Sequence, residues 1–176
     1  MQHGFEENKS RQASAKTDDK AFHLRVKGTQ NMAKYEIQSN RGTPPRGAYS
    51  QGWRAGDFIF VTGTGPGDPA TGKLVGETIE WQTEQTIDNI SAILETDGAS
   101  LRDVVKVTVH LSDTSLFARY NAVYALKFAK PYPVRTTVGS DLGHAPGMLI
   151  EMDCIAYVGK AGKTRSKGGS PGKRRR

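Results

Sequence analysis

Between residues 32 and 159, the spacing of apolar side chains changes several times between the period of a strand and that of a helix. Strand-like runs occur at 32–37, 58–61, 105–111, 135–138 and 148–158, and helical spacing occurs at 79–94 and 114–128. This β-β-α-β-α-β-β order predicts an α+β fold in which two helices pack on one face of a mixed sheet. Because the pattern offers no third helix, self-association is the simplest way to cover the opposite face.

The two predicted helices have recognisable ends. The first shows helical spacing of apolar or small residues, namely Ile79, Thr83, Ile87, Ile90 and Leu94. Gly98 is the glycine expected just beyond its C-terminus. Asp113 or Thr114 is the candidate N-cap of the second helix, and Pro131 and Pro133 end that helix.

Both ends of the chain differ in composition from this central domain. Residues 1–31 are polar and nearly free of periodicity, and residues 160–176 carry eight basic and no acidic side chains. We therefore expect a disordered extension at 1–31, a single domain at 32–159 and a disordered basic tail at 160–176. Although the whole chain has a formal charge of +7, the domain carries eleven basic and fourteen acidic residues, or −3. We expect nucleic acid to bind weakly at most, through the tail.

The cysteine, histidine and hydropathy patterns exclude several classes of protein. Cys154 is the single cysteine, so an intramolecular disulfide framework and a zinc site built on several thiolates are excluded. The four histidines lack ligand spacing, and we expect neither a metal nor a cofactor. No apolar run approaches the roughly 18 residues that span a bilayer, and no apolar signal segment begins the chain. These patterns predict a soluble, cytoplasmic protein with no membrane partner.

Arg135 is the first candidate for chemistry. It begins an apolar strand directly after Pro131-Tyr132-Pro133-Val134, and the prolines make that approach rigid. A guanidinium held in this way presents five fixed donors, which suit a carboxylate. The alternative is a surface ion pair with Asp141 or Glu151.

Two carboxylates lie in the last predicted strand, which is otherwise apolar. Glu151 and Asp153 are two residues apart and therefore share one face, and the opposite face carries Ile150, Met152, Cys154 and Ala156. Such acids occur either on a solvated face or in a polar pocket, where burial would raise a carboxyl pKa and allow proton transfer. No Ser-His-Asp or Cys-His arrangement is indicated, which disfavours a covalent mechanism.

Three further positions have both a structural and a functional interpretation. Tyr49 precedes a strand and closes a pocket in one interpretation, whereas in the other it is a structural tyrosine. Asn121 in the second helix is an ordinary exposed amide unless it faces a site. The Thr62-Gly63-Thr64-Gly65-Pro66 turn lacks the lysine and glycine spacing of a phosphate-binding loop, so we expect no nucleotide there.

Ordered sequence matches between about Tyr35 and Val158 carry a family resemblance. They are Gly47-Ala48-Tyr49-Ser50-Gln51, Phe58 to Gly63, Asp68 to Gly76, Gln82 to Thr86 with Asn89-Ile90, Val104 to Leu111, Phe117 to Asn121 with Tyr124, Pro133-Val134-Arg135 and Ile150-Glu151-Met152. Together they resemble the Rid (reactive intermediate deaminase) family, also known as the YjgF family of enamine and imine deaminases.

The resemblance implies a chorismate-mutase-like α+β fold, assembled as a homotrimer with its sites between subunits. It implies hydrolysis of reactive 2-imino or enamino acids to 2-oxo acids and ammonia, without metal or cofactor. In that reaction Arg135 would hold the carboxylate of the small substrate and Glu151 would position water or move protons. Tyr49, Thr62, Gly63 and Asn121 match other substrate-binding positions of the family.

Several departures from the family pattern border this site. Thr64-Gly65 follow Gly63 where many deaminases have glutamine, and Thr136-Thr137 follow the arginine where Ser-Cys is frequent. The loop at 139–148 is slightly longer than usual. Substrate preference therefore stays open. The alternatives are a non-catalytic protein that senses 2-oxo acids through the same pocket, and a ribonuclease or translation inhibitor, against which the −3 charge of the domain argues.

Overall fold

The computed structural model describes residues 34–143 and 145–159, and the predictions for 1–31 and 160–176 lie outside these ranges. Within them the chain forms six strands and two α-helices, with short 3-10 turns at Leu101–Asp103 and Thr114–Leu116. The strands and helices in chain order are β1 (Lys34–Ile37), β2 (Gly52–Ala55), β3 (Phe58–Thr64), α2 (Ile79–Thr96), β4 (Val104–Leu111), α3 (Phe117–Lys127), β5 (Val134–Gly139) and β6 (Ile150–Tyr157).

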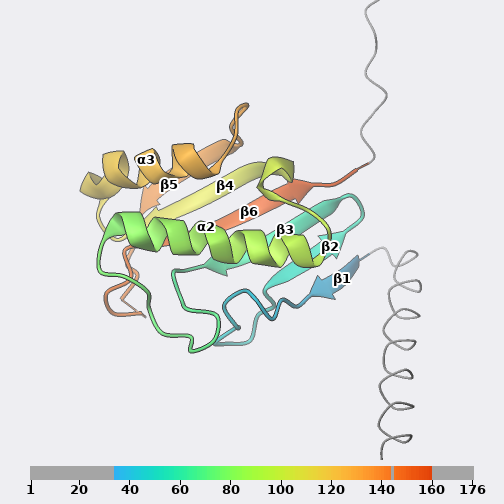
Figure 1. Cartoon of the computed structure of the whole chain (residues 1–176), viewed down its shortest axis with the longest axis horizontal. Helices are drawn as coiled ribbons and strands as arrows, with labels where there is room; N and C mark the ends of the chain where they lie inside the picture. The colour runs from blue at the N-terminus through green and yellow to red at the C-terminus, as the bar shows by residue number, and fades with distance from the viewer. Residues whose placement is uncertain (1–33, 144, 160–176) are drawn as a thin grey trace, which may run out of the picture.

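A single sheet contains all six strands, in the order β1-β2-β3-β6-β4-β5. Neighbouring strands are antiparallel except β4 and β5, which are parallel. Helices α2 and α3 pack against each other on one face of the sheet (Figure 1). The predicted mixed sheet with two helices on one face is therefore confirmed.

The domain begins with three strands, whereas the sequence pattern predicted two. The additional strand, β2, pairs with both β1 and β3. A two-residue loop, Gly56-Asp57, joins β2 to β3, and Gly56 has a φ of +56°, which favours glycine. This loop is a hairpin signal in the sequence, but β2 itself reads Gly-Trp-Arg-Ala and lacks the run of β-branched residues that marks a strand.

The helix ends follow the sequence signals closely. At the start of α2 the Thr78 hydroxyl accepts a hydrogen bond from the Trp81 amide, and beyond its end Gly98 has a φ of +74°. Asp113 caps the 3-10 turn that leads into α3, since its side chain accepts a 2.8 Å hydrogen bond from the Ser115 amide. The predicted glycine beyond the C-terminus of the first helix is confirmed. Asp113, predicted as the N-cap of the second helix, caps the preceding 3-10 turn instead, and Leu116 precedes α3 without a side-chain capping bond.

The core lies between the helices and the sheet. It is built mainly from fully buried aliphatic residues, among them Ile59, Ile79, Ile87, Ile90, Val107 and Ile150. Burial of each such side chain contributes about 1.5–3 kcal/mol to folding. Cys154 also faces this core, and burial raises the pKa of its thiol to about 12, so it is not a nucleophile at neutral pH.

The other face of the sheet exposes large apolar side chains. Trp53, Phe58, Phe60 and Tyr157, from β2, β3 and β6, are each more than two-fifths exposed. Exposed aromatic residues gathered in this way are typical of a surface that another protein covers. That a second copy covers it stays a prediction. No helix among the described residues is long and apolar enough to cross a membrane.

Candidate active site

The predicted site residues form two groups, which lie at different places in the same chain. Four of them line a cavity of about 920 Å³: Tyr49, Thr62, Gly63 and Glu151. The other two, Asn121 of α3 and Arg135 of β5, contact each other outside it. The cavity is close to the upper end of the range usual for small-molecule sites.

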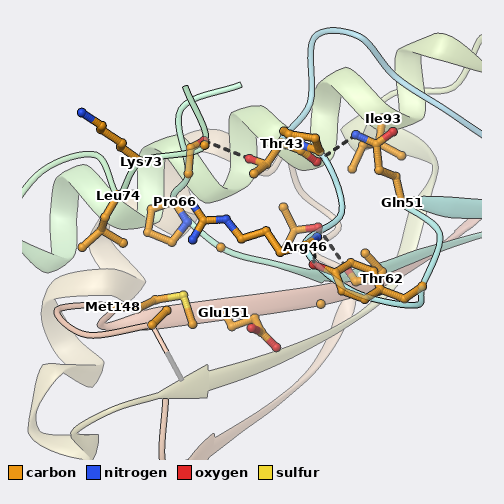
Figure 2. A pocket seen from close by; sticks show the side chains of 18 of the residues that line it. Thr43, Arg46, Gln51, Thr62, Pro66, Lys73, Leu74, Ile93, Met148 and Glu151 are labelled. Atoms are coloured by element: carbon orange, nitrogen blue, oxygen red, sulfur yellow. Dashed lines mark hydrogen bonds between the residues drawn. The ribbon is translucent and has the colours of Figure 1, made fainter. Parts of the chain in front are cut away.

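The walls of the cavity come from segments that are distant in sequence (Figure 2). They are the segment 43–51 before β2, the end of β3 with the loop 64–67, residues 72–74 and residues 145–148. Ile93 of α2 and Glu151, near the start of β6, complete the lining. The register between β3 and β6 shifts between Val61 and Thr64, and this irregularity coincides with the two lining residues Thr62 and Gly63.

Buried amide side chains hold two of these walls together. The Gln51 amide donates to the Thr43 carbonyl at 2.8 Å, and the Asn89 amide donates to the Gly65 and Gly67 carbonyls at 3.0 and 2.8 Å. Asn89 also donates to the Thr43 hydroxyl at 2.7 Å. Because buried backbone carbonyls need partners, these bonds fix the segment before β2 against the loop after β3.

A third buried amide fixes the wall formed by residues 145–148. The Gln82 amide donates to the Gly147 carbonyl at 2.9 Å and to the Gly76 carbonyl at 3.0 Å, and its carbonyl accepts a 2.7 Å bond from the Leu149 amide. The family resemblance included Gln82 and Asn89 without giving them a role. A signal for such a role is present in the sequence. Gln82 and Asn89 are polar residues seven positions apart, and both lie on the buried face of an amphipathic helix.

Tyr49 and Glu151 lie at the wall of the cavity. The Tyr49 hydroxyl accepts a 3.0 Å hydrogen bond from the Arg46 amide, and the side chain is half-exposed. A Cβ added to Gly63 would lie 2.6 Å from Oε1 of Glu151. The close approach of this carboxyl group therefore requires glycine at position 63.

Arg135 lies against one face of α3. Its Nη2 donates to the Asn121 carbonyl oxygen at 2.9 Å. The guanidinium carbon is 4.5, 5.2 and 5.6 Å from the ring centroids of Tyr124, Tyr120 and Phe117. Residues three, four and seven apart share a helix face, so α3 supplies all four contacts at once. The sequence pattern assigned these aromatic residues to helix packing alone, and their contact with Arg135 was missed.

The partners of Arg135 differ from the surface ion pair considered above. Within the described residues its guanidinium contacts an amide and three rings, but neither Asp141 nor Glu151. Burial raises the pKa of the neighbouring Tyr124 phenol to about 12, and the positive charge of Arg135 opposes this rise only in part. The phenol is thus neutral at pH 7, and the positive charge of Arg135 is not compensated by it.

Arg135 and Glu151 project from opposite faces of the sheet. In the strand register Arg135 is beside Val107 of β4, and Glu151 is beside His110 of the same strand. Val107 is fully buried on the helix-covered face, and His110, three residues later, faces the other side. A small substrate therefore cannot contact both side chains within a single chain.

The described residues contain no group of three or more histidine, cysteine, aspartate or glutamate side chains placed to hold a metal ion. The cavity instead offers one carboxylate, backbone groups of the glycine-rich loop and a tyrosine hydroxyl. A cavity of this size, beside the irregular strand β3 of an α+β sheet, is typical of proteins that bind small molecules.

Comparisons with known proteins identify the family. The family described as Endoribonuclease L-PSP matches residues 40–158. A RutC family protein of Pyrococcus abyssi is 48% identical over 127 residues, which cover 72% of this chain and 98% of that protein. The chloroplastic Reactive Intermediate Deaminase A of Arabidopsis thaliana is 38% identical over 130 residues, covering 73% of this chain and 68% of that protein.

A solved structure agrees with these sequence matches. The crystal structure of RidA from the Antarctic bacterium Psychrobacter superposes on this chain with a TM-score of 0.67 and 37% identity, and the match covers 70% of this chain and 99% of that one. The chain therefore belongs to the Rid family, also called the YjgF or RutC family. The resemblance inferred from the sequence is confirmed.

Proposed function

We propose that this protein hydrolyses 2-imino and enamino acids to 2-oxo acids and ammonia. The observation that carries the proposal is the setting of Arg135, whose charge is held by Asn121 and three aromatic rings without a carboxylate partner among the described residues. Such a guanidinium has donors left for the carboxylate of a substrate. Membership of a family that includes a relative named as a reactive intermediate deaminase supports the same reaction.

The chemistry needs only orientation and proton transfer. The C2 carbon of an iminium acid is already electrophilic, so one oriented water attacks it and forms a C–O bond. Glu151 accepts a proton from that water, and a proton is returned to the nitrogen. The C–N bond then breaks and ammonia leaves, while the C2 hydroxyl loses its remaining proton to Glu151 or to solvent and becomes the carbonyl of the 2-oxo acid. An enamino acid first takes a proton at C3 to become the iminium form.

The site we propose is shared between copies of the chain. Because Arg135 and Glu151 leave the sheet on opposite faces, one copy would supply Arg135 and Asn121 and the next would supply the cavity with Glu151. The exposed aromatic residues on the uncovered face give such an assembly an apolar surface to bury. In keeping with the family resemblance, we propose a homotrimer with three such sites.

A deaminase assay tests the proposal. An amino-acid oxidase generates 2-iminobutyrate or 2-iminopropionate in situ, and 2-oxo acid formation is followed with and without the protein. We expect a clear acceleration, and Arg135→Ala should lower kcat/KM by roughly 10- to 100-fold, since it removes a charge-assisted contact worth about 1.5–3 kcal/mol.

Arg102→Ala is the matched control, because Arg102 is exposed in the turn before β4 and lies outside the cavity. It should react at the wild-type rate. Equal rates with and without wild-type protein would contradict the deaminase and would favour the alternative of a regulatory protein that binds 2-oxo acids in the same cavity.

The family description, Endoribonuclease L-PSP, raises cleavage of RNA as a second candidate. The charge of −3 on residues 32–159 opposes it, because RNA binding relies on neutralising phosphates with basic side chains. Labelled RNA is incubated with the full protein and with a chain that lacks residues 160–176, and its cleavage is measured. Cleavage that survives removal of the tail would support a nuclease in the domain.

A further inference from the structure

The cavity contains a cation, Arg46, that the proposed reaction does not use. Arg46 lies in the segment before β2, and its side chain extends through the pocket toward Pro66 (Figure 2). Its backbone amide is bonded to Tyr49, but its guanidinium makes no hydrogen bond or ion pair to any described residue. An arginine without an acidic partner presents all of its side-chain donors to whatever occupies the pocket.

Arg46 and Glu151 lie toward different ends of one cavity wall. Nη2 of Arg46 is 3.2 Å from where a Cβ on Gly72 would lie, and Gly72 in turn is packed beside Gly67. The Glu151 carboxyl group lies against Gly63 instead. Gly63 and Gly67 are four positions apart in the sequence, so their backbones are at most roughly 14 Å apart. A substrate side chain that extends from Glu151 along this wall would approach the Arg46 guanidinium.

The charges around the cavity are unequal at the two ends. Among the described lining residues, Glu151 is the one carboxylate, and it lies at the reacting end. The cations of the lining are Arg46 and Lys73, and the Lys73 ammonium points away from the other labelled side chains in Figure 2. The far end of the cavity is thus positive, chiefly because of Arg46, and suits an anionic group.

The segment that carries Arg46 is anchored on both sides. The Arg46 amide donates to the Tyr49 hydroxyl at 3.0 Å, and the Thr43 hydroxyl donates to the Gly67 carbonyl at 2.9 Å. The Gln51 side-chain amide donates a 2.8 Å hydrogen bond to the Thr43 carbonyl. Anchoring of the backbone reduces the conformational entropy that Arg46 loses when it binds an anion.

We propose that Arg46 is a specificity-determining residue that selects substrates with a second anionic group, a carboxylate or phosphate, at the end of the side chain. This rests on the proposed deaminase function, in which Arg135 binds the carboxylate next to the reacting carbon. Arg46 then binds the distal anion, so acidic imino acids react in preference to neutral ones of equal length.

Competition between matched substrates tests this. The imines of norvaline and glutamate have the same number of chain carbons and differ in the distal carboxylate, and the imine of O-phosphohomoserine presents a phosphate instead. We expect at least one of the two acidic imines to exceed the norvaline imine in kcat/KM. In Arg46→Gln the ratio of kcat/KM for the acidic imine to kcat/KM for the norvaline imine should fall by roughly 10- to 100-fold. Arg46→Lys should restore part of this ratio.

Arg41→Gln is the matched control, because Arg41 also lies between β1 and β2 but forms an exposed ion pair with Glu95 at 3.0 Å, outside the cavity. The ratio of kcat/KM between the acidic and norvaline imines should be the same in Arg41→Gln as in the wild type. A ratio that is the same in wild type and Arg46→Gln, or a wild-type preference for the norvaline imine over both acidic imines, would overturn the proposal. The acidic imine that loses most in Arg46→Gln identifies the anion.

Binding of 2-oxo acids separates this proposal from the deaminase itself. Calorimetry compares 2-oxoglutarate and 2-oxo-4-phosphobutyrate with 2-oxopentanoate, and needs no turnover. Stronger binding of an acidic compound, weakened by roughly 10-fold or more in Arg46→Gln, supports Arg46 even if no imine is hydrolysed. Equal binding of all three compounds to the wild type refutes it even if the norvaline imine is hydrolysed.

Discussion

At the residue scale, the contact between Glu151 and Gly63 is the tightest constraint on the candidate site. The carboxyl group occupies the space in which any larger residue at position 63 would have its Cβ. Because the group displaced would be the end of a flexible side chain, a substitution there moves Glu151 without disturbing the core. Position 63 therefore controls the orientation of the proposed water-positioning group.

We predict that Gly63→Ala lowers kcat by roughly 10-fold or more, because misplacing a proton-transfer group by an ångström costs one to two orders of magnitude. Thermal unfolding of the variant should stay close to that of the wild type. In the control Gly139→Ala, the new Cβ would meet the Thr114 methyl group at 3.1 Å and not the Glu151 carboxyl group. Wild-type kcat in Gly63→Ala would show that the carboxyl group can be displaced without consequence.

At the element scale, α2 has two functions. Its apolar side chains fill the core, and two polar residues on the same buried face, Gln82 and Asn89, bind the backbone of the cavity loops. The helix is thus the frame from which three loops are positioned. Since a buried carbonyl without a partner costs free energy, each amide contributes to stability and to the shape of the cavity together.

Asn89→Ala should lower the free energy of unfolding by about 1–3 kcal/mol, because it leaves the part-buried Gly65 and Gly67 carbonyls without this donor. Urea denaturation measures the loss. Glu84→Ala on the same helix removes an exposed ion pair to Lys127 and should cost less than about 1 kcal/mol. If the two variants proved equally stable, the amide would not be holding the loops.

At the scale of the whole molecule, the arrangement of the sheet separates the two proposed catalytic groups. Arg135 is on the edge strand β5, and Glu151 is two strands away on β6, on the opposite face. The proposed mechanism therefore requires a second copy of the chain. It follows that a defect in Arg135 and a defect in Glu151 should complement each other between copies.

A mixing experiment measures this complementation. Arg135→Ala and Glu151→Gln should each have little activity alone, whereas a refolded one-to-one mixture should recover about a quarter of the wild-type rate, since a quarter of randomly assembled interfaces carry both intact residues. Light scattering of the wild type should give three chains per particle. A mixture no more active than its components, or a monomeric particle, would contradict the shared site.

Local patterns in the sequence determined most of the secondary structure and the faces of its elements. Apolar periodicity predicted both helices, five of the six strands and the buried side of β6, because each depends on residues a few positions apart. The missed strand, β2, lacks such a pattern. It is a strand because it pairs with β1 on one side and with β3 on the other. The motifs around Arg135 and Glu151 identified the family and selected these residues as candidates.

Only the tertiary structure decided how these candidates are placed. That Arg135 and Glu151 face opposite ways depends on strand register across β4, and the setting of Arg135 depends on the packing of α3. The orientation of Arg46 depends on loops joined by buried amides from distant segments. Contacts of this kind leave no periodic signal, because they link residues whose separation along the chain is unrelated to their distance in space.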